Sequence, residues 1–420
     1  MTILRLTSAM LGAVSLAVGV PRAAGAQASN AEPLTVGDVV ALARANHPAI
    51  RAASARGRAV VAAARQEAAF SNPVLELRRE NLGSPIARDE FATITQPLDL
   101  TGRRFALRAS ARELARRTFA DSASVMRDVE ANAARAFWRA SLARALVTIA
   151  EEHRADAERL ARFETERARE GAVAEVSAMR ARMEADRARV AEASAAAALT
   201  QAIADLSRAT GVPADSLPPV SALAARIPAI PAAPSVDAAV ERALVSRSEL
   251  TALRAAEAAA GHRRSAEQRA VLPDVVVQAG AKQTAGYSTR VLGVAVPLPL
   301  FSQNRAARDR AAAELELVRT ELRAAEQSIR TSVAATIESY DALRAAQPDD
   351  STTARAIEVA AIADAAYAAG GSSLLELIDA RRARSETLAA VLRWVADVRI
   401  VQTDLARALG ASPLDPLTLP

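Results

Sequence analysis

The spacing of apolar residues in the C-terminal half predicts a long amphipathic helix. Apolar side chains recur at steps of three and four, the period of one helix face. In the N-terminal half, residues 103–170 contain neither glycine nor proline. This run predicts another long helix, and a helix of that length spans roughly 100 Å. Such a helix is stable only when it packs along its length against others. The apolar stripe of the C-terminal helix consists of Leu315, Val318, Leu322, Ala325, Ile329, Val333, Ile337, Tyr340 and Leu343.

Four further runs without glycine or proline predict helices at 172–210, 304–347, 349–369 and 372–409, and Pro348 separates two of them. Two other segments, 73–98 and 273–298, alternate apolar and polar residues between prolines. We interpret each of these two as a β-hairpin. The expected turns are Asn81-Leu82-Gly83-Ser84-Pro85 and a turn near Gly286; Thr101 and Ser302 are candidate N-caps of the helices that follow.

The pattern occurs twice, about 200 residues apart. Asn72-Pro73 returns as Leu272-Pro273, Gln96-Pro97-Leu98 as Val296-Pro297-Leu298, Gly102-Arg103-Arg104 as Gln303-Asn304-Arg305, and Gly171 as Gly370. Repeats are sought before a fold is assigned. This one predicts two structural repeats, 27–210 and 235–410, joined by a Pro-rich linker at 211–234 and followed by an irregular tail at 411–420.

The N-terminus resembles an export signal. Arg5 precedes an apolar run from Leu6 to Val20, and Ala24-Gly25-Ala26 offers a small-residue cleavage site. A transmembrane anchor is the alternative, but the run is short and contains serine and glycine. We therefore expect residues 1–26 to be a signal peptide, and no later segment has the apolar length of a membrane-spanning helix.

The composition excludes several classes of function. The formal charge is +5 and Lys282 is the only lysine, but arginine alternates with acids along helix faces without basic blocks. That pattern is typical of a solvated helix surface rather than a nucleic-acid interface. The chain has no cysteine. His47, His153 and His262 lie on separate elements without metal-ligand spacing, and no nucleophile–base pair or phosphate loop is evident. We expect no enzyme activity, no cofactor and no bound metal.

Four short strands cannot close a barrel, and an open edge in lipid costs several kcal/mol per unsatisfied group. The strand lengths suit a tilted transmembrane barrel. We therefore expect several chains to share one β-barrel, with their long helices forming a second cylinder. The fold class is mainly α with a small β part.

Three segments resemble the TolC-like outer membrane efflux proteins. They are LTVGDVVALARANHPAIRAA at 34–53, TQPLDLTGRR at 95–104 and VAVPLPLFSQNR at 294–305, and the last two are similar to the CzcC-type branch that serves heavy-metal exporters. The resemblance implies a homotrimer in outer membrane lipid, with a shared twelve-stranded barrel and a periplasmic α-barrel. It also implies passive conduction, powered by an inner-membrane resistance-nodulation-division (RND) pump and linked to it by a periplasmic adaptor (membrane fusion) protein.

The same resemblance assigns roles to the turns between the long helices. The hairpin tips would dock the adaptor, and acids after the second tip would form a ring at the pore entrance that attracts cations. Ordinary first-turn helix acids are the alternative for these acids. Two arginines would form entrance ion pairs or plain surface pairs. The tip residues are Gly171, Ala172, Val173, Glu175, Gly370, Gly371, Ser372 and Ser373; the ring acids are Glu376 and Asp379; the arginines are Arg180 and Arg381.

Alternative functions remain open at this point. Within the family the channel would serve drug efflux or type I protein secretion instead of metals. Outside the family, the chain could be a periplasmic helical adaptor. An adaptor has one helical hairpin, and the twofold repeat of this chain predicts two. The other alternative is a structural coiled-coil protein, which would explain the long helices but would lack the paired strand segments.

Overall fold

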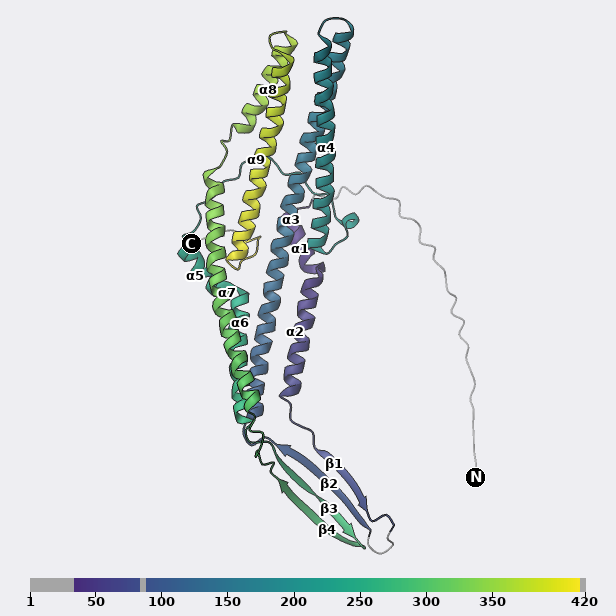
Figure 1. Ribbon diagram of the computed structural model, residues 1–420, viewed down its shortest axis with the longest axis vertical. Coiled ribbons are helices and arrows are strands. Elements are labelled where there is room, and N and C mark those ends of the chain that lie inside the picture. The colour runs from purple at the N-terminus through teal and green to yellow at the C-terminus, as the bar shows by residue number, and fades with distance from the viewer. Residues whose placement is uncertain (1–33, 84–87, 416–420) are drawn as a thin grey trace, which may run out of the picture.

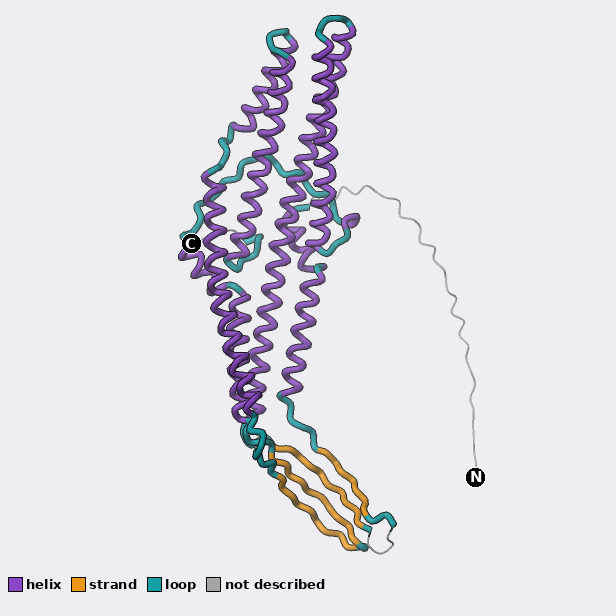
Figure 2. Tube along the Cα trace, viewed as in Figure 1, coloured by secondary structure: helices purple, strands orange, loops and turns teal. Residues whose placement is uncertain are grey.

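The computed structural model describes residues 34–83 and 88–415. The expected signal segment, part of the first hairpin turn and the end of the tail lie outside these residues. The described part is a long molecule with the sheet at one end and two helical hairpin tips at the other (Figure 1). The tube in Figure 2 shows that strands occupy only the sheet end, and that helices with their connecting loops form the rest.

The helices and strands follow the repeat. The first set is α1 (Val36–Asn46), α2 (Pro48–Glu67), β1 (Val74–Glu80), β2 (Asp89–Leu98), α3 (Arg103–Arg169) and α4 (Glu175–Thr210); after a 3-10 turn (Ala214–Ser216), the second is α5 (Val236–Ser246), α6 (Ser248–Arg269), β3 (Val275–Thr284), β4 (Tyr287–Ala295), α7 (Arg305–Ala345), α8 (Thr352–Ala368) and α9 (Leu374–Ala408). The single helix α3 corresponds to two helices, α7 and α8. The helix is interrupted at Pro348, because proline lacks the N–H that a helix needs and its ring clashes with the preceding turn.

The two β-hairpins form one antiparallel sheet in the order β1-β2-β3-β4. The prediction of both hairpins is confirmed, and β2 pairs with β3 along its whole length. Gly280 is required at this junction, because a Cβ there would lie 2.2 Å from the carbonyl oxygen of Ala92. Ala285 and Gly286 both have positive φ at the tight turn between β3 and β4, as a two-residue hairpin turn needs.

The predicted apolar stripe on α7 is the face of that helix that packs against its neighbours. Ile329, Val333, Ile337 and Tyr340 are buried with α5 and α9 residues in one core cluster. A matching cluster joins α1, α3 and α4 in the first half, and half of its buried side chains are alanine. Among the described residues, no helix is both long and apolar enough to cross a membrane.

The predicted N-caps at Thr101 and Ser302 are wrong. The residue before α3 is Gly102, with φ of 73°, and the residue before α7 is Asn304, with φ of 56°. Each chain segment enters its helix from a left-handed residue. At α3 the carboxylate of Asp99 accepts hydrogen bonds from the amides of Arg103 at 3.2 Å and Arg104 at 2.7 Å. The Thr101 hydroxyl accepts only a longer bond from the Arg103 amide, at 3.4 Å.

The segment between the halves packs on the helices. The amide of Leu223 donates to the carbonyl of Ser141 on α3 at 3.0 Å. Leu223, Ile227 and Ile230 lie against a cluster on α9 that includes Trp394. This side of α9 is therefore covered by the chain itself.

Candidate functional site at the hairpin tips

Both helical hairpins turn with the same backbone geometry. Gly171 and Gly370 have φ of 73° and 75°, a conformation that glycine adopts without steric cost. Ala172 N–H donates to the Arg167 carbonyl, and Gly371 N–H to the Ala366 carbonyl, each at 2.8 Å. These bonds satisfy the last carbonyls of α3 and α8. The remaining tip residues Val173, Ser372 and Ser373 lie in the same short turns.

The two tips differ where the next helix begins. Ser373 and Glu376 form a reciprocal capping box at the start of α9: the serine amide donates to the Glu376 carboxylate at 2.7 Å, and the Glu376 amide donates to the serine hydroxyl at 3.3 Å. The bond from the Ser373 amide holds the pKa of Glu376 below its usual value. In the first tip the residue before α4 is Ala174, which has no side-chain cap. Glu376 is thus a structural cap in this conformation.

Glu376 and Asp379 are exposed, three residues apart at the start of α9. Three residues separate neighbours on one helix face, so both carboxylates project from the same side of the tip. The first hairpin has Glu175 at its helix start and no aspartate nearby. Negative charge of this spacing is therefore confined to the second tip.

Arg381 connects the two hairpins. Its guanidinium pairs with Asp364 on α8 at 2.6 Å and donates to the Asp156 carbonyl on α3 at 3.3 Å. Arg180 is exposed and has no ion pair within the described part of the chain. Arg180 and Arg381 are therefore not equivalent positions of the two hairpins. The position that matches Arg381 is Arg182, which reaches Thr165 in its own hairpin just as Arg381 reaches Asp364.

A second contact between the hairpins was not predicted. The hydroxyl of Tyr367 on α8 donates to Glu164 on α3 at 2.6 Å, and Arg167 donates to the same oxygen at 3.3 Å. The Glu164 side chain is fully buried. Burial, together with the Glu164 carboxylate, raises the pKa of Tyr367 to about 12. One signal was available: Glu164 continues the apolar series Ala157, Leu160 and Ala161 on α3, where an acid is out of place.

A third contact lies further from the tips. Glu184 on α4 is almost fully buried and pairs with Arg382 of α9, with His153 of α3 3.5 Å away. Arg384 of α9 pairs with Glu152 of α3 at 3.1 Å. The other histidines are elsewhere: His47 caps α2 and His262 is exposed on α6. Within residues 34–83 and 88–415, no cluster of three or more metal-ligand side chains is present.

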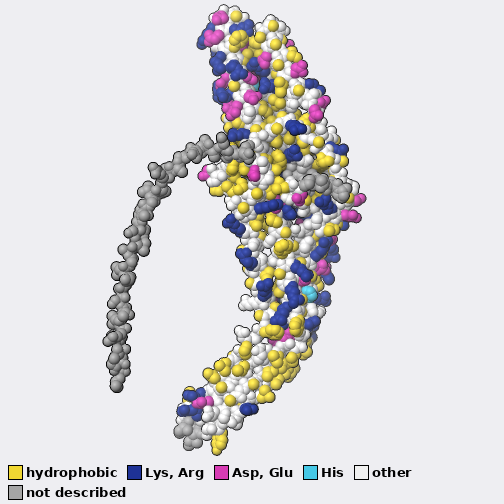
Figure 3. Space-filling model, turned by 180° about the vertical axis from the view of Figure 1, so that it is seen from behind, with side chains coloured by type: hydrophobic (Ala, Val, Ile, Leu, Met, Phe, Trp, Pro, Cys, Tyr) yellow, Lys and Arg dark blue, Asp and Glu magenta, His cyan; other side chains and the backbone are white. Residues whose placement is uncertain are grey.

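The surface divides by chemistry. Figure 3 shows apolar side chains gathered over the sheet end, while basic and acidic side chains are mixed over the helices. On the sheet, Leu77 is 74% exposed and Leu292 is 81% exposed, which is unusual for aqueous surroundings and suits lipid. An apolar strand face continued by long polar helices indicates a membrane protein with a large extramembrane part.

The chain belongs to the outer membrane efflux protein family, whose model matches residues 39–212 and 239–411. It is therefore an outer membrane efflux channel protein, as the sequence analysis expected. It is 30% identical over 338 residues to the nickel-cobalt-cadmium resistance protein NccC of Alcaligenes xylosoxydans xylosoxydans, covering 74% of this chain and 72% of NccC. It is 31% identical over 319 residues to the nickel and cobalt resistance protein CnrC of Cupriavidus metallidurans, covering 68% and 70%.

Solved structures confirm the fold. The crystal structure of CusC superposes with a TM-score of 0.70 at 20% identity, covering 90% of this chain and 92% of CusC. The outer membrane protein VceC of Vibrio cholerae gives 0.72 at 17% identity, covering 90% and 96%. The mainly helical architecture with a small sheet is thus shared across proteins of low sequence identity.

Proposed function

We propose that three copies of this chain form the outer membrane exit channel of a tripartite heavy-metal efflux system. The observation that carries the proposal is the sheet with two free edges. β1 and β4 each pair on one side only, and their apolar side chains are exposed. In lipid such edges must be paired, and identical neighbours supply complementary edges: β1 of one copy meets β4 of the next.

The helical layer has free sides that fit the same arrangement. On α4, Val176, Met179, Met183 and Val190 are exposed at steps of three, four and seven residues, which places them on one face. The buried alanines of α4 face α3 on the opposite side. At the other side of the layer, Ile357 and Ile362 of α8 are exposed. Head-to-tail contact between these two sides closes a ring.

The cargo is inferred from the relatives. NccC and CnrC are named for resistance to nickel, cobalt and, for NccC, cadmium, so we propose divalent transition-metal cations as the substrate. Conduction is passive, and an RND pump in the inner membrane supplies the energy. A periplasmic adaptor protein docks at the tips around Gly171 and Gly370. The helices extend into the periplasm from the outer membrane.

The acids of the second tip then act at the entrance. In a trimer, Glu376 and Asp379 of each copy surround the axis, and a ring of carboxylates attracts cations and repels anions. Arg381 holds the second hairpin against the first, which keeps the entrance narrow; Arg180 is free to contact a neighbouring copy.

The test is single-channel recording in planar bilayers with the Glu376→Ala/Asp379→Ala variant. We expect reduced block by divalent cations and weaker cation selectivity. The matched control is Glu175→Ala, which removes an acid from the first tip and should leave both properties unchanged. Unaltered selectivity in the double variant would refute the ring. Absence of any channel activity in the wild type would refute the proposed function.

Transport separates the cargo alternatives. Cells that express the chain with a metal-exporting pump and adaptor should gain resistance to nickel or cobalt. Resistance to drugs alone, or secretion of a protein substrate, would assign the channel to another branch of the family.

A further inference from the structure

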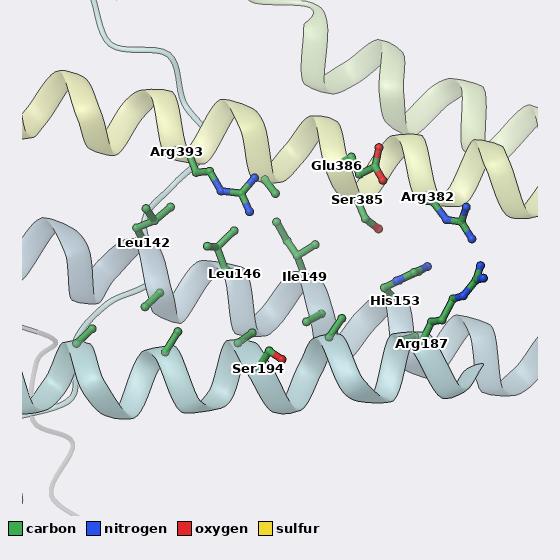
Figure 4. A pocket seen from close by; sticks show the side chains of 18 of the residues that line it. Leu142, Leu146, Ile149, His153, Arg187, Ser194, Arg382, Ser385, Glu386 and Arg393 are labelled. Carbon is green, nitrogen blue, oxygen red and sulfur yellow. The ribbon is translucent and has the colours of Figure 1, made fainter. Parts of the chain in front are cut away.

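A groove lies between α4 and α9, with α3 as its floor. Its volume is about 980 Å³, at the upper end of the range for small-molecule sites. Figure 4 shows Leu142, Leu146 and Ile149 standing on α3 between the two flanking helices. Their spacing of four and three residues places them on one side of α3, so that an aliphatic strip runs along the floor.

The wall on α4 is smooth and apolar. It is formed by alanines that recur at steps of three and four residues. Small side chains leave room for a ligand and offer it mostly methyl groups, with the hydroxyl of Ser194 among them, so the groove favours an aliphatic body. The wall residues are Ala188, Ala191, Ala195, Ala198 and Ala202.

Positive charge is in excess along the groove. Arg139 and Arg393 line it and are exposed, and within the described residues neither forms an ion pair or hydrogen bond. Figure 4 shows Arg393 reaching from α9 over the floor, above Leu142 and Leu146. At the other end, the Glu184 carboxylate is already shared by Arg382, Arg187 and His153. One further acid, Glu386, lines the groove, but in the described part of the chain it forms no ion pair with Arg139 or Arg393. The charges of these two arginines are therefore not neutralised.

The groove lies on the side of the helical layer opposite to the linker. Groove residues of α9 include Arg382, Ala389 and Arg393, whereas linker residues pack on the side that carries Val391, Val395 and Val398. At 100° per residue these sets lie on opposite faces. If the layer closes into a ring with the linker outside, the groove opens into the channel interior.

We propose that this groove binds a water-soluble amphiphilic organic anion, with its aliphatic body on the Leu142–Ile149 floor and its carboxylate or sulfonate between Arg139 and Arg393. Charge complementarity selects the anion, because a guanidinium presents a planar fork that matches a carboxylate. The interior position rests on the proposed function, and the ligand enters from the aqueous channel rather than from the bilayer.

The test is equilibrium dialysis of radiolabelled decanoate against the full-length protein in lipid nanodiscs, with empty nanodiscs subtracted. We expect saturable binding that weakens at least tenfold in Arg139→Gln/Arg393→Gln. Affinity should fall about threefold or more for each methylene removed between decanoate and hexanoate, and decyltrimethylammonium should not compete.

The matched control is Arg112→Gln/Arg162→Gln, which removes the same charge from exposed positions of α3 that lie away from the groove. It should bind decanoate as the wild type does. Equal loss in both double variants, or binding no greater than that of empty nanodiscs, would overturn the proposal. So would occupancy only by oleate supplied within the bilayer.

Conductance of the same preparation is recorded separately. A protein that conducts but does not bind decanoate refutes the groove alone. A protein that binds decanoate but does not conduct refutes the channel alone.

Discussion

The two helical hairpins of this chain have the same turns but different support. In the first, α3 continues without interruption from the sheet to the tip. In the second, the helix is broken between Ala345 and Thr352, and the tip is carried by α8, which packs mainly on α9. The tip of the first hairpin is therefore connected to the sheet by one continuous helix, whereas the tip of the second is connected through the break between α7 and α8.

Polar contacts hold the second hairpin to the first. Near the tips they include the Tyr367–Glu164 hydrogen bond, the bond from Arg381 to the Asp156 carbonyl, and the Arg382–Glu184 and Arg384–Glu152 pairs. An apolar cluster lies beside them, in which Leu377 and Ile378 of α9 meet α3 and α4. A segment with few apolar contacts opens locally at lower free energy than the core. Among the described residues of α8 only Ala360 is buried, so we expect the second tip to open more readily than the first, with these contacts setting its position.

The largest effect is expected from Glu164→Ala. It leaves Tyr367 without its acceptor and Arg167 without its ion-pair partner, and loss of a buried charged acceptor costs roughly 1–3 kcal/mol. Amides of α8 and the first turns of α9 should exchange hydrogen faster, by about tenfold per 1.4 kcal/mol, while α4 changes less. Glu166→Ala removes only an exposed pair with Arg169 and should have almost no effect. Equal acceleration in both hairpins would contradict the proposed asymmetry.

A pH dependence follows from Tyr367. Its pKa is raised from 10.0 to about 12, so the neutral phenol stabilises the folded state below pH 10. That stability is lost as the pH rises toward 12. We expect the second tip to gain mobility in this window, measured by a nitroxide label placed at Ser372→Cys.

The phenylalanine variant is the control for this titration. Tyr367→Phe lacks the ionisable group and should be mobile already at neutral pH, without the alkaline transition. Tyr287→Phe changes an exposed tyrosine of β4 and should keep the transition. An identical alkaline transition in Tyr367→Phe would show that another group titrates.

The smallest effect concerns the caps. Ser373→Ala removes the capping box of α9 and should cost about 1 kcal/mol; Ala174→Ser gives the first tip the cap it lacks and should stabilise α4 by a similar or smaller amount. Hydrogen exchange at the first turns of α4 and α9 measures both. If neither substitution changes protection, the difference between the helix starts has no energetic consequence.

The long helices and strand hairpins were predictable because they depend on local pattern. Runs without glycine or proline gave α3, α4 and α9, and Pro348 gave the break between α7 and α8. The contact of Glu164 with Tyr367 was not predictable, since the residues are 203 positions apart and nothing local fixes how one hairpin lies against another. The caps at Thr101 and Ser302 failed because each helix is entered through a left-handed residue. The roles of Glu376 and Asp379 stay predictions.

Cysteine cross-linking of the two edge strands tests the shared barrel most directly. The chain has no cysteine, so Leu77→Cys on β1 can be combined with cysteine at Val291, Leu292 or Gly293 on β4. Within one chain β1 and β4 are separated by two strands, roughly 14 Å at the usual spacing, beyond the reach of a disulfide. The account predicts that oxidation in membranes gives covalent dimers and trimers and nothing larger. Monomers alone at every register, or a ladder that continues beyond trimers, would contradict it.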